Sequence, residues 1–332
     1  MNHRGVKALI TDTFPTETPL AFGLHPNAEI GFKLREADAM CSSMLSMQPR
    51  EASGEAGAST EDKARSVLDD VSERLPEEFD LEDIRKRAEE VTPYVMVAIQ
   101  ETERMNRLLR EIRRSLAELD LGLRGDLTMT SNMERVMTAL ANDAVPPSWA
   151  LVAYPSLRPL GSWFLNLIAR CNQLSNWVAD LQLPPVIWIS GLFNPQSFLT
   201  AVMQTTARRN EWPLDKTVIV TEVTKKQPEE VTQPSRDGAF ICGLTLEGAR
   251  WDGLAGCLDD SKPKQLFTPM PVILVKAVTA EKADLRDVYQ CPVYFTESRF
   301  RQEVFTAQIR SKAPSNKWER ASVAMMLDVA SL

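Results

Sequence analysis

The spacing of apolar residues changes once along the chain, and this change limits the possible fold more than any other feature. As far as Trp212 and Pro213, apolar residues recur mainly three or four positions apart, as they do in amphipathic helices. Beyond that point, short runs of strand-forming residues alternate with loops containing proline, glycine and aspartate. The sequence therefore predicts an α+β fold, in which a helical N-terminal half precedes an antiparallel β-barrel-like subdomain with packed helices.

The first half carries signals for the beginnings and ends of helices. A short helix is expected near residues 37–47, and Ser59 with Asp62 is typical of the start of another. A short helix at residues 80–90 precedes a long one that begins after Pro93. The apolar stripe of the long helix is interrupted at Glu101, and Gly122 lies where its end is expected. Ser131 with Glu134 predicts one more capped helix.

Two features divide the sequence. Residues 50–60 are rich in glycine, serine, alanine and glutamate, a composition that predicts a mobile loop. Pro146 and Pro147 stop the preceding helix and mark the expected boundary between subdomains. We therefore predict an N-terminal segment at 1–48, a helical subdomain at 49–145, and a mixed helix and β-barrel-like subdomain at 146–332.

The second half begins with the clearest amphipathic stripe of the sequence, at residues 160–181, and continues with a buried strand at 186–190. Asn194 and Pro195 predict the start of a buried helix. Residues 318–332 return to helical spacing, so a C-terminal helix is expected to plug or cover the sheet. Five aromatic residues are expected to anchor the core: Trp163, Trp177, Trp188, Phe198 and Trp251. The expected strands lie at 217–223, 239–246, 272–278, 288–295 and 304–309.

Charge and composition exclude several classes of partner. The net charge of −7 and the absence of a basic stripe argue against nucleic acid and against an anionic membrane. The longest uncharged run, 181–207, contains three prolines and several amides, so it is not a transmembrane helix. Zinc coordination by the usual spacings is excluded because the cysteines are widely spaced and the only histidines are His3 and His25. The cysteines are Cys41, Cys171, Cys242, Cys257 and Cys291, and free thiols in a reducing cytosolic compartment are expected.

No catalytic, cofactor-binding or metal-binding residue can be assigned from these patterns. The glycines of 243–248 are followed by Ala249 and Arg250 rather than by the lysine of a phosphate-binding loop. Arg250 and Asp252 are expected to form a local ion pair beside a buried Trp251. His25 is the one candidate base, and two interpretations stay open: a residue that shapes a turn before Pro26, or a base paired with a cysteine in a hydrolase-like site. The carboxylate pairs Glu77-Glu78, Glu89-Glu90 and Glu229-Glu230 are expected to be exposed.

Particular strings resemble the C-terminal region of dynein heavy chains, in the same order and over nearly the whole sequence from residue 22. In style they are most similar to axonemal chains, particularly the β-type chains of the outer arm. The strings are FGLHPNAEIGF (22–32), LPEEF (75–79), ERMN (103–106), ELDLGLRG (118–125), WISGLFNPQSFLTA (188–201), EWPLDK (211–216), LEGARWD (246–252) and CPVY (291–294).

The resemblance implies a segment that follows the last AAA+ module of a minus-end-directed microtubule motor of cilia and flagella. It implies a non-catalytic role that braces the AAA+ ring and regulates motor output, with ATP and magnesium bound in other modules of the parent motor and no cofactor in this chain. The implied partners are the ring modules of the same heavy chain and, through the parent complex, dynein intermediate and light chains and microtubules. The implied location is the cytoplasm, the cytoskeleton and the axoneme of the cilium.

Residues 1–20 match this family only weakly, and the AAA+ modules that should precede them are missing, so we expect the protein to be a fragment of a heavy chain rather than a free-standing domain. The helix at 101–118 and the segment at 22–32 are the expected contact surfaces for the ring. The alternative is a free-standing hydrolase-like enzyme that uses His25 and a cysteine.

Overall fold

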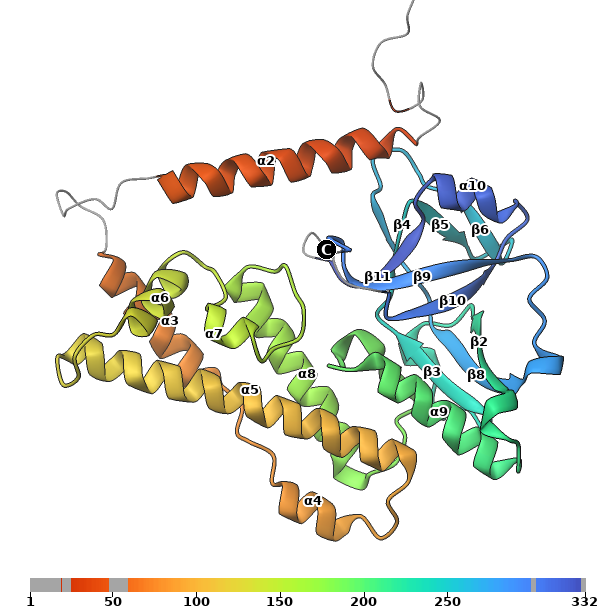
Figure 1. Cartoon of the computed structure of the whole chain (residues 1–332), viewed down its shortest axis with the longest axis horizontal. Helices are drawn as coiled ribbons and strands as arrows, with labels where there is room; N and C mark the ends of the chain where they lie inside the picture. The colour runs from red at the N-terminus through yellow and green to blue at the C-terminus, as the bar shows by residue number, and fades with distance from the viewer. Residues whose placement is uncertain (1–18, 20–24, 48–58, 300–302, 330–332) are drawn as a thin grey trace, which may run out of the picture.

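The computed structural model describes residues 19, 25–47, 59–299 and 303–329. Helices form one side of the molecule and sheets form the other, with α9 packed beneath the sheets (Figure 1). This arrangement confirms the α+β class. Residues 50–58 of the predicted mobile loop lie outside the described residues, whereas residues 59 and 60 form the start of a helix. The helices are α2 (Asn27–Met47), α3 (Thr60–Arg74), α4 (Leu81–Arg87), α5 (Pro93–Arg124), α6 (Ser131–Ala141), α7 (Pro147–Ala150), α8 (Leu160–Asp180), α9 (Pro195–Arg209) and α10 (Ser315–Arg320).

Capping side chains explain where several helices begin. The Ser59 hydroxyl accepts the backbone N–H of Asp62, and the Asp62 carboxylate accepts the N–H of Ser59, so the predicted start of α3 is confirmed. Asn194 caps α9 through its side-chain oxygen, which accepts the N–H of Ser197 at 3.2 Å, also as predicted. Helix α6 differs, because Thr130 rather than Ser131 provides the capping oxygen.

Helix α5 is the longest helix among the described residues and the centre of the helical side. It packs against α3, α4, α6, α7, α8 and α9. The Thr92 hydroxyl caps its start, and its end lies at Gly125 rather than at the predicted Gly122. Gly125 has a φ of +82°, a left-handed conformation that glycine adopts without strain, whereas Gly122 remains helical.

The strands form a four-stranded sheet, a five-stranded sheet and a two-stranded hairpin. The four-stranded sheet has the order β1-β3-β8-β2, the five-stranded sheet has the order β10-β9-β11-β4-β7, and β5 pairs with β6. The β1–β3 and β9–β11 pairs are parallel, and the other pairs are antiparallel. The strands are β1 (Val186–Trp188), β2 (Thr217–Val223), β3 (Gly238–Cys242), β4 (Thr245–Glu247), β5 (Ala249–Asp252), β6 (Cys257–Asp260), β7 (Phe267–Pro269), β8 (Ile273–Thr279), β9 (Val288–Thr296), β10 (Phe305–Arg310) and β11 (Ala324–Asp328).

The sheets are not closed into a barrel, because no backbone ladder joins the two larger sheets among the described residues. Side chains join them instead where β2 lies beside β10. The Thr221 hydroxyl donates to the carbonyl of Gln308 at 3.0 Å and accepts its N–H at 2.6 Å. The Thr221 N–H donates to the Gln308 side chain at 2.8 Å. The expected barrel is therefore two open sheets connected at one seam.

Two predicted elements of the second half are wrong. The run at 239–246 is two strands in different sheets, because Gly243 turns the backbone with a φ of +88° and lies against Trp188, where a Cβ would be 2.2 Å from the indole. The expected C-terminal helix at 318–332 ends early, since α10 stops at Arg320 and β11 follows. Every residue of β11 is buried between β9 and β4. A continuous apolar run of this length does not separate strand from helix by its spacing.

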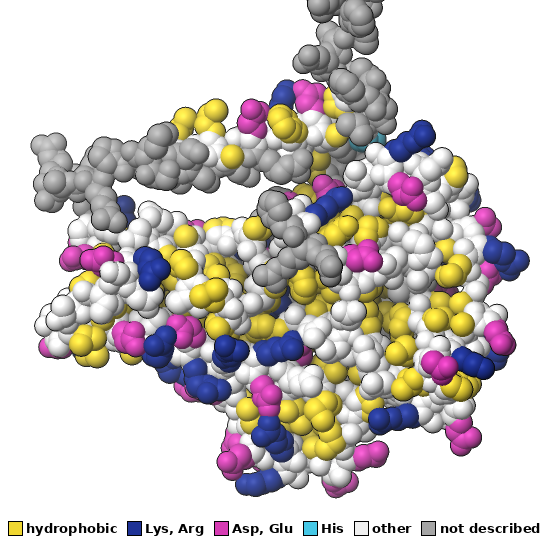
Figure 2. All heavy atoms as spheres, viewed as in Figure 1, with side chains coloured by type: hydrophobic (Ala, Val, Ile, Leu, Met, Phe, Trp, Pro, Cys, Tyr) yellow, Lys and Arg dark blue, Asp and Glu magenta, His cyan; other side chains and the backbone are white. Residues whose placement is uncertain are grey.

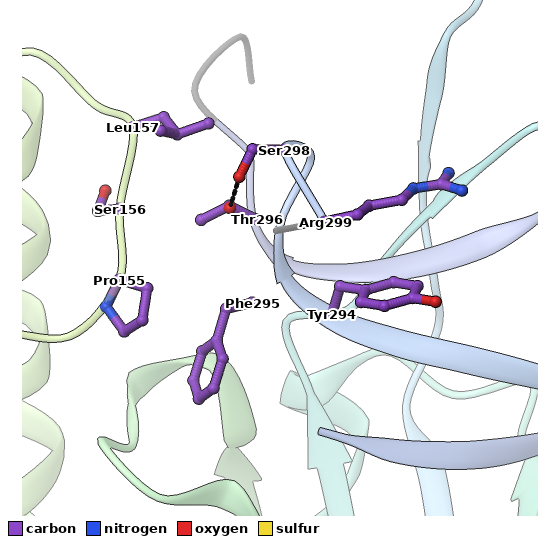
Figure 3. Close-up of a pocket in the computed structure, with 8 residues that line it drawn as sticks. All are labelled: Pro155, Ser156, Leu157, Tyr294, Phe295, Thr296, Ser298 and Arg299. Atoms are coloured by element: carbon purple, nitrogen blue, oxygen red, sulfur yellow. Dashed lines mark hydrogen bonds between the residues drawn. The ribbon is translucent and has the colours of Figure 1, made fainter. Parts of the chain in front are cut away.

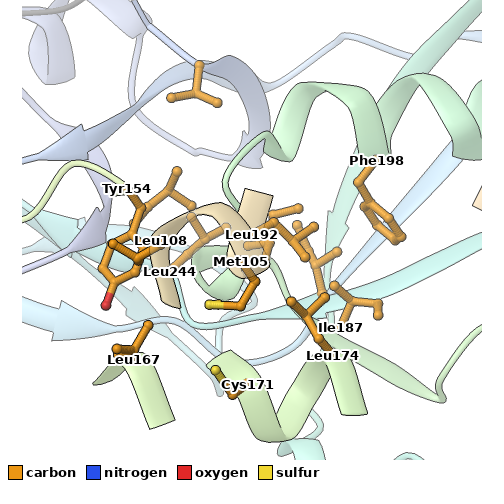
Figure 4. Packing of buried hydrophobic residues seen from close by; sticks show 14 of the residues in the cluster. Met105, Leu108, Tyr154, Leu167, Cys171, Leu174, Ile187, Leu192, Phe198 and Leu244 are labelled. Atoms are coloured by element: carbon orange, nitrogen blue, oxygen red, sulfur yellow. The ribbon is translucent and has the colours of Figure 1, made fainter. Parts of the chain in front are cut away.

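One large buried cluster extends from α3 to β11, and Figure 4 shows a part of it that includes residues of α5, α8, β1 and α9. Trp163, Trp177 and Phe198 are fully buried, as predicted. Trp188 and Trp251 are only half-buried, so they are not the core anchors that were expected. Trp149 and Trp318 are fully buried. The predicted division at Pro146 stays a prediction, although the cluster includes residues from both sides of it.

Candidate functional site: a buried ion cluster between the helices and the sheets

Glu101 lies in the N-terminal third of α5 with only 1% of its surface exposed. Its carboxylate accepts the backbone N–H of Phe193 and, at 3.0 Å, the N–H of Asn194, immediately before α9. Burial raises the pKa of Glu101, and these two hydrogen bonds lower it in part. The side chain that interrupted the apolar stripe in the sequence therefore joins α5 to the beginning of α9.

Arg170 is a second buried charge, which α8 directs toward the loop between α7 and α8. It is 2% exposed, and its Nε donates to Asn166 at 2.7 Å. The guanidinium carbon lies 3.4 Å from the ring centroid of Tyr154 and 5.3 Å from that of Trp188. Burial lowers the pKa of Arg170, whereas Tyr154, Asp328 and Glu101 raise it. The Nη1 atom makes no hydrogen bond among the described residues.

Asp328 completes the cluster from the sheet side, at the end of β11. Its carboxylate accepts hydrogen bonds from Arg158 Nε at 2.7 Å and from the Ser156 hydroxyl at 2.5 Å. Both partners belong to the loop between α7 and α8, and Asp328 is 6% exposed. The ion pair therefore ties the last strand to the helical side. With Glu101 and Arg170, it brings charges of both signs to the boundary between helices and sheets.

A pocket of about 200 Å³ opens beside Asp328. Figure 3 shows that the segment 155–157 forms one wall and that the end of β9 with the following turn forms the other. The hydroxyls of Thr296 and Ser298 are 2.9 Å apart and hydrogen-bonded to each other. Arg299 also lines this pocket and pairs with Glu247. Its cation and the nearby hydroxyls are thus already engaged within the protein.

The histidine of the enzyme alternative contacts backbone atoms. His25 Nδ1 accepts the N–H of Asn27 at 3.1 Å, and Nε2 is 3.1 Å from the carbonyl of Ser261. Among the described residues, no hydrogen bond joins His25 to a cysteine. Burial raises the pKa of the Cys171 thiol to about 12 and that of Cys242 to about 11, which keeps both protonated at neutral pH. This geometry supports the interpretation of His25 as a residue that shapes a turn.

Other candidate residues are placed differently from expectation. Arg250 pairs with Asp259 across the β5–β6 hairpin rather than with Asp252, whose carboxylate instead accepts the N–H groups of Leu254 and Ala255. Glu77 and Glu78 pair with arginines of α5, and the other two carboxylate pairs are exposed, as predicted.

The two expected contact surfaces also differ from each other. Half of the residues of the helix at 101–118 are buried, and its exposed positions are chiefly arginines. In the described part of the other expected surface, 22–32, Asn27 is buried and residues 26, 28, 29 and 32 are exposed. In the rest of α2, every described side chain as far as Met44 is exposed. Phe32, Leu34, Met40 and Met44 have between 50% and 60% of their surface exposed. Residues 22–24 of the other expected surface lie outside the described residues.

Two further kinds of site are absent from the part of the protein that the structure describes. Within it, no helix is both long and apolar enough to cross a membrane. Over the same residues, no group of three or more His, Cys, Asp or Glu side chains is arranged to hold a metal ion.

Comparisons with known proteins place the protein in a family. The family model of the C-terminal domain of the dynein heavy chain matches residues 34–327. The dynein beta chain of the flagellar outer arm of Chlamydomonas reinhardtii is 65% identical over 331 residues, which are 99% of this chain and 7% of that protein. The ciliary dynein beta chain of Heliocidaris crassispina is 48% identical over 330 residues, again covering 99% and 7%.

The human dynein axonemal heavy chain 9 is 46% identical over 331 residues, with the same coverage of both proteins. The chain thus spans about 7% of the length of these relatives. The family match includes Glu101 and Arg170 and ends one residue before Asp328, and the relatives align over 99% of the chain. The chain belongs to the family of C-terminal domains of dynein heavy chains.

Proposed function

We propose that this chain acts as the C-terminal part of an axonemal, outer-arm β-type dynein heavy chain, within the cytoskeleton of the cilium or flagellum. In that setting it is a non-catalytic unit that braces the AAA+ ring and regulates motor output. ATP and magnesium bind in other modules of the heavy chain, and this part meets microtubules and the intermediate and light chains only through the complex. The names of its relatives support the axonemal setting.

The exposed helix α2 is the single observation that carries the bracing role. In this 21-residue helix, the large apolar side chains Phe32, Leu34, Met40 and Met44 are exposed, so these four gain little from packing on the described part of the chain. Figure 2 shows apolar side chains along this helix, above the body of the molecule. We infer that α2 is covered in the complete heavy chain and that the ring modules of the same polypeptide cover it.

The buried ion cluster supports the regulatory role. Glu101 joins α5 to the start of α9, and both Arg170 of α8 and Asp328 of β11 contact the loop between α7 and α8, so these polar contacts add to the shared apolar core at the boundary between sheets and helices. A chain with these contacts can transmit a conformational change of the AAA+ ring without catalysing a reaction itself. The hydrolase alternative has no comparable support, because both nitrogens of His25 face backbone atoms.

The test is a pair of substitutions in the complete heavy chain. Met40→Asp with Met44→Asp places charges on the exposed face of α2 and should alter ATP-dependent microtubule gliding velocity at least twofold, while the purified protein keeps its melting temperature. The control is Leu254→Asp, which introduces one aspartate at a leucine that is 95% exposed and lies in the β5–β6 turn, and it is compared with each single substitution as well as with the pair. Unchanged gliding in the double variant would contradict the bracing role of α2.

A further inference from the structure

His25 and Asn27 make hydrogen bonds that the proposed function does not use. Asn27 is 7% exposed and uses all the hydrogen-bonding groups of its side chain on one loop. Its Nδ2 donates to the carbonyl of Lys262 at 3.0 Å and to that of Gln265 at 2.8 Å, and its Oδ1 accepts the N–H of Lys264 at 2.8 Å. A fully satisfied buried amide of this kind fixes the geometry of both segments.

His25 adds a fourth connection to the same loop. Because the N–H of Asn27 donates to Nδ1, that nitrogen carries no hydrogen, and Nε2–H donates to the carbonyl of Ser261. The loop lies between β6 and β7, more than 230 residues along the sequence from α2. We call this arrangement the entry clamp, defined as His25 and Asn27 with the loop residues 261–265.

The entry clamp holds the first turn of α2 on the sheet side of the molecule. The described side chains from Phe32 to Met44 are exposed, in contrast to the buried Asn27. Figure 1 shows α2 leaving the sheets at this end and running across the molecule toward the helical side. The first turn of α2 is therefore held on the sheet side of the molecule.

We propose that His25 and Asn27 are positioning residues that attach the preceding part of the heavy chain to the sheets, so that movement in that part is passed first to the β6–β7 loop and its sheet neighbours. This inference rests on the proposed function and specifies the path by which movement of the ring reaches this chain. Strands β5 and β6 form the hairpin before the loop, and β7 pairs with β4, which in turn pairs with β11. Asp328, at the end of β11, then connects to the helical side.

The experiment is hydrogen–deuterium exchange of the complete heavy chain, measured with and without ATP. Three variants are used. Asn27→Ala removes the three side-chain bonds to the loop. His25→Asn retains an oxygen that can accept the N–H of residue 27 but is too short to reach Ser261. Lys33→Ala is the control, on the same helix, where Lys33 pairs with the exposed Glu29.

In the first two variants, exchange at residues 261–267 should become about tenfold faster, the change that corresponds to the loss of one buried hydrogen bond. The wild-type protein should also show an ATP-dependent difference in exchange at 245–269, and Asn27→Ala should abolish it. If the wild type shows no such difference, the proposed coupling to the ring fails as a whole. If the difference exists and persists in Asn27→Ala, the coupling is real but the entry clamp does not carry it.

Discussion

Glu101 is the residue on which the junction between α5 and α9 depends. Its carboxylate is the acceptor for the backbone N–H groups of two half-buried residues that precede α9. Without it those groups would lose both water and their partner, and an unsatisfied buried donor costs about 1–3 kcal/mol. This single side chain therefore contributes more than an exposed ion pair of α5, since such a pair is worth about 0–1 kcal/mol.

Replacement of this carboxylate gives the first prediction. Glu101→Ala should lower the free energy of unfolding by about 2–4 kcal/mol, because it orphans the two N–H groups and leaves a cavity. Urea unfolding followed by circular dichroism measures this quantity. Glu103→Ala is the control, since Glu103 pairs with Arg85 at the surface and should cost less than about 1 kcal/mol. Equal effects of the two substitutions would refute the role assigned to Glu101.

The raised pKa of Glu101 predicts a pH dependence of stability. The folded protein holds this proton more tightly than the unfolded protein, so the contribution of the group to the unfolding free energy is complete below the ordinary pKa of glutamate and falls as pH rises through the raised value. Glu101→Gln removes this titration, so stability plotted against pH should fall less steeply than in the wild type over that interval. Parallel curves for the two proteins would show that Glu101 does not titrate with a raised pKa.

The spacing of its neighbours indicated that Glu101 is buried, although glutamate is usually an exposed residue. Val97, Glu101 and Met105 are four residues apart, so they lie on one face of a helix, and the two apolar members are buried. A glutamate at such a position must find buried donors, but those donors belong to residues 193 and 194. The local spacing predicts that the carboxylate is buried, but it does not identify the hydrogen-bond donors, which are distant in sequence.

Some neighbouring elements are joined by side-chain hydrogen bonds rather than by backbone pairing between strands. The seam between β2 and β10 is one such contact, in which Thr221 and Gln308 take the place of backbone pairing. The Asp328 contact with Arg158 and Ser156 is another. Each of these contacts consists of a few side-chain hydrogen bonds, so a single substitution can remove it without changing the backbone pairing of a strand.

Removal of the hydroxyl at the seam gives a prediction for these elements. Thr221→Val preserves the shape of the side chain but leaves the N–H and carbonyl of Gln308 without that partner, which should cost about 1–3 kcal/mol of unfolding free energy. Amide exchange at residues 305–310 should also become faster. Thr306→Val is the control on the neighbouring strand β10, because that hydroxyl donates to the exposed Glu303. A stability equal to that of the control variant would show that the seam is not stabilising.

The sequence predicted the elements unevenly, for physical reasons. Caps such as Ser59 and Asn194 are local, so the starts of α3 and α9 could be read directly. Strand β11 could not, because its residues are all buried between two strands that are distant in sequence. The short strands β5, β6 and β7 were missed because only their pairing stabilises them.

The whole molecule has one main apolar core, although its sequence suggests two parts. The largest buried cluster contains residues from α3 and also from β10 and β11, on both sides of Pro146. A shared core of this kind favours cooperative unfolding. Tryptophan fluorescence and far-ultraviolet circular dichroism should therefore report one coincident transition in urea. Two separated transitions would instead support independent subdomains divided at residues 146 and 147.

The proposed role requires that this chain work inside a much longer polypeptide. The most direct measurement is an immunoblot of isolated axonemes with an antibody against this chain, on a gel that resolves very large proteins. We predict a band far above the 37.2 kDa of the chain itself, enriched with axonemes. A band at 37.2 kDa that is absent from axonemes would contradict the proposed role as part of a dynein heavy chain.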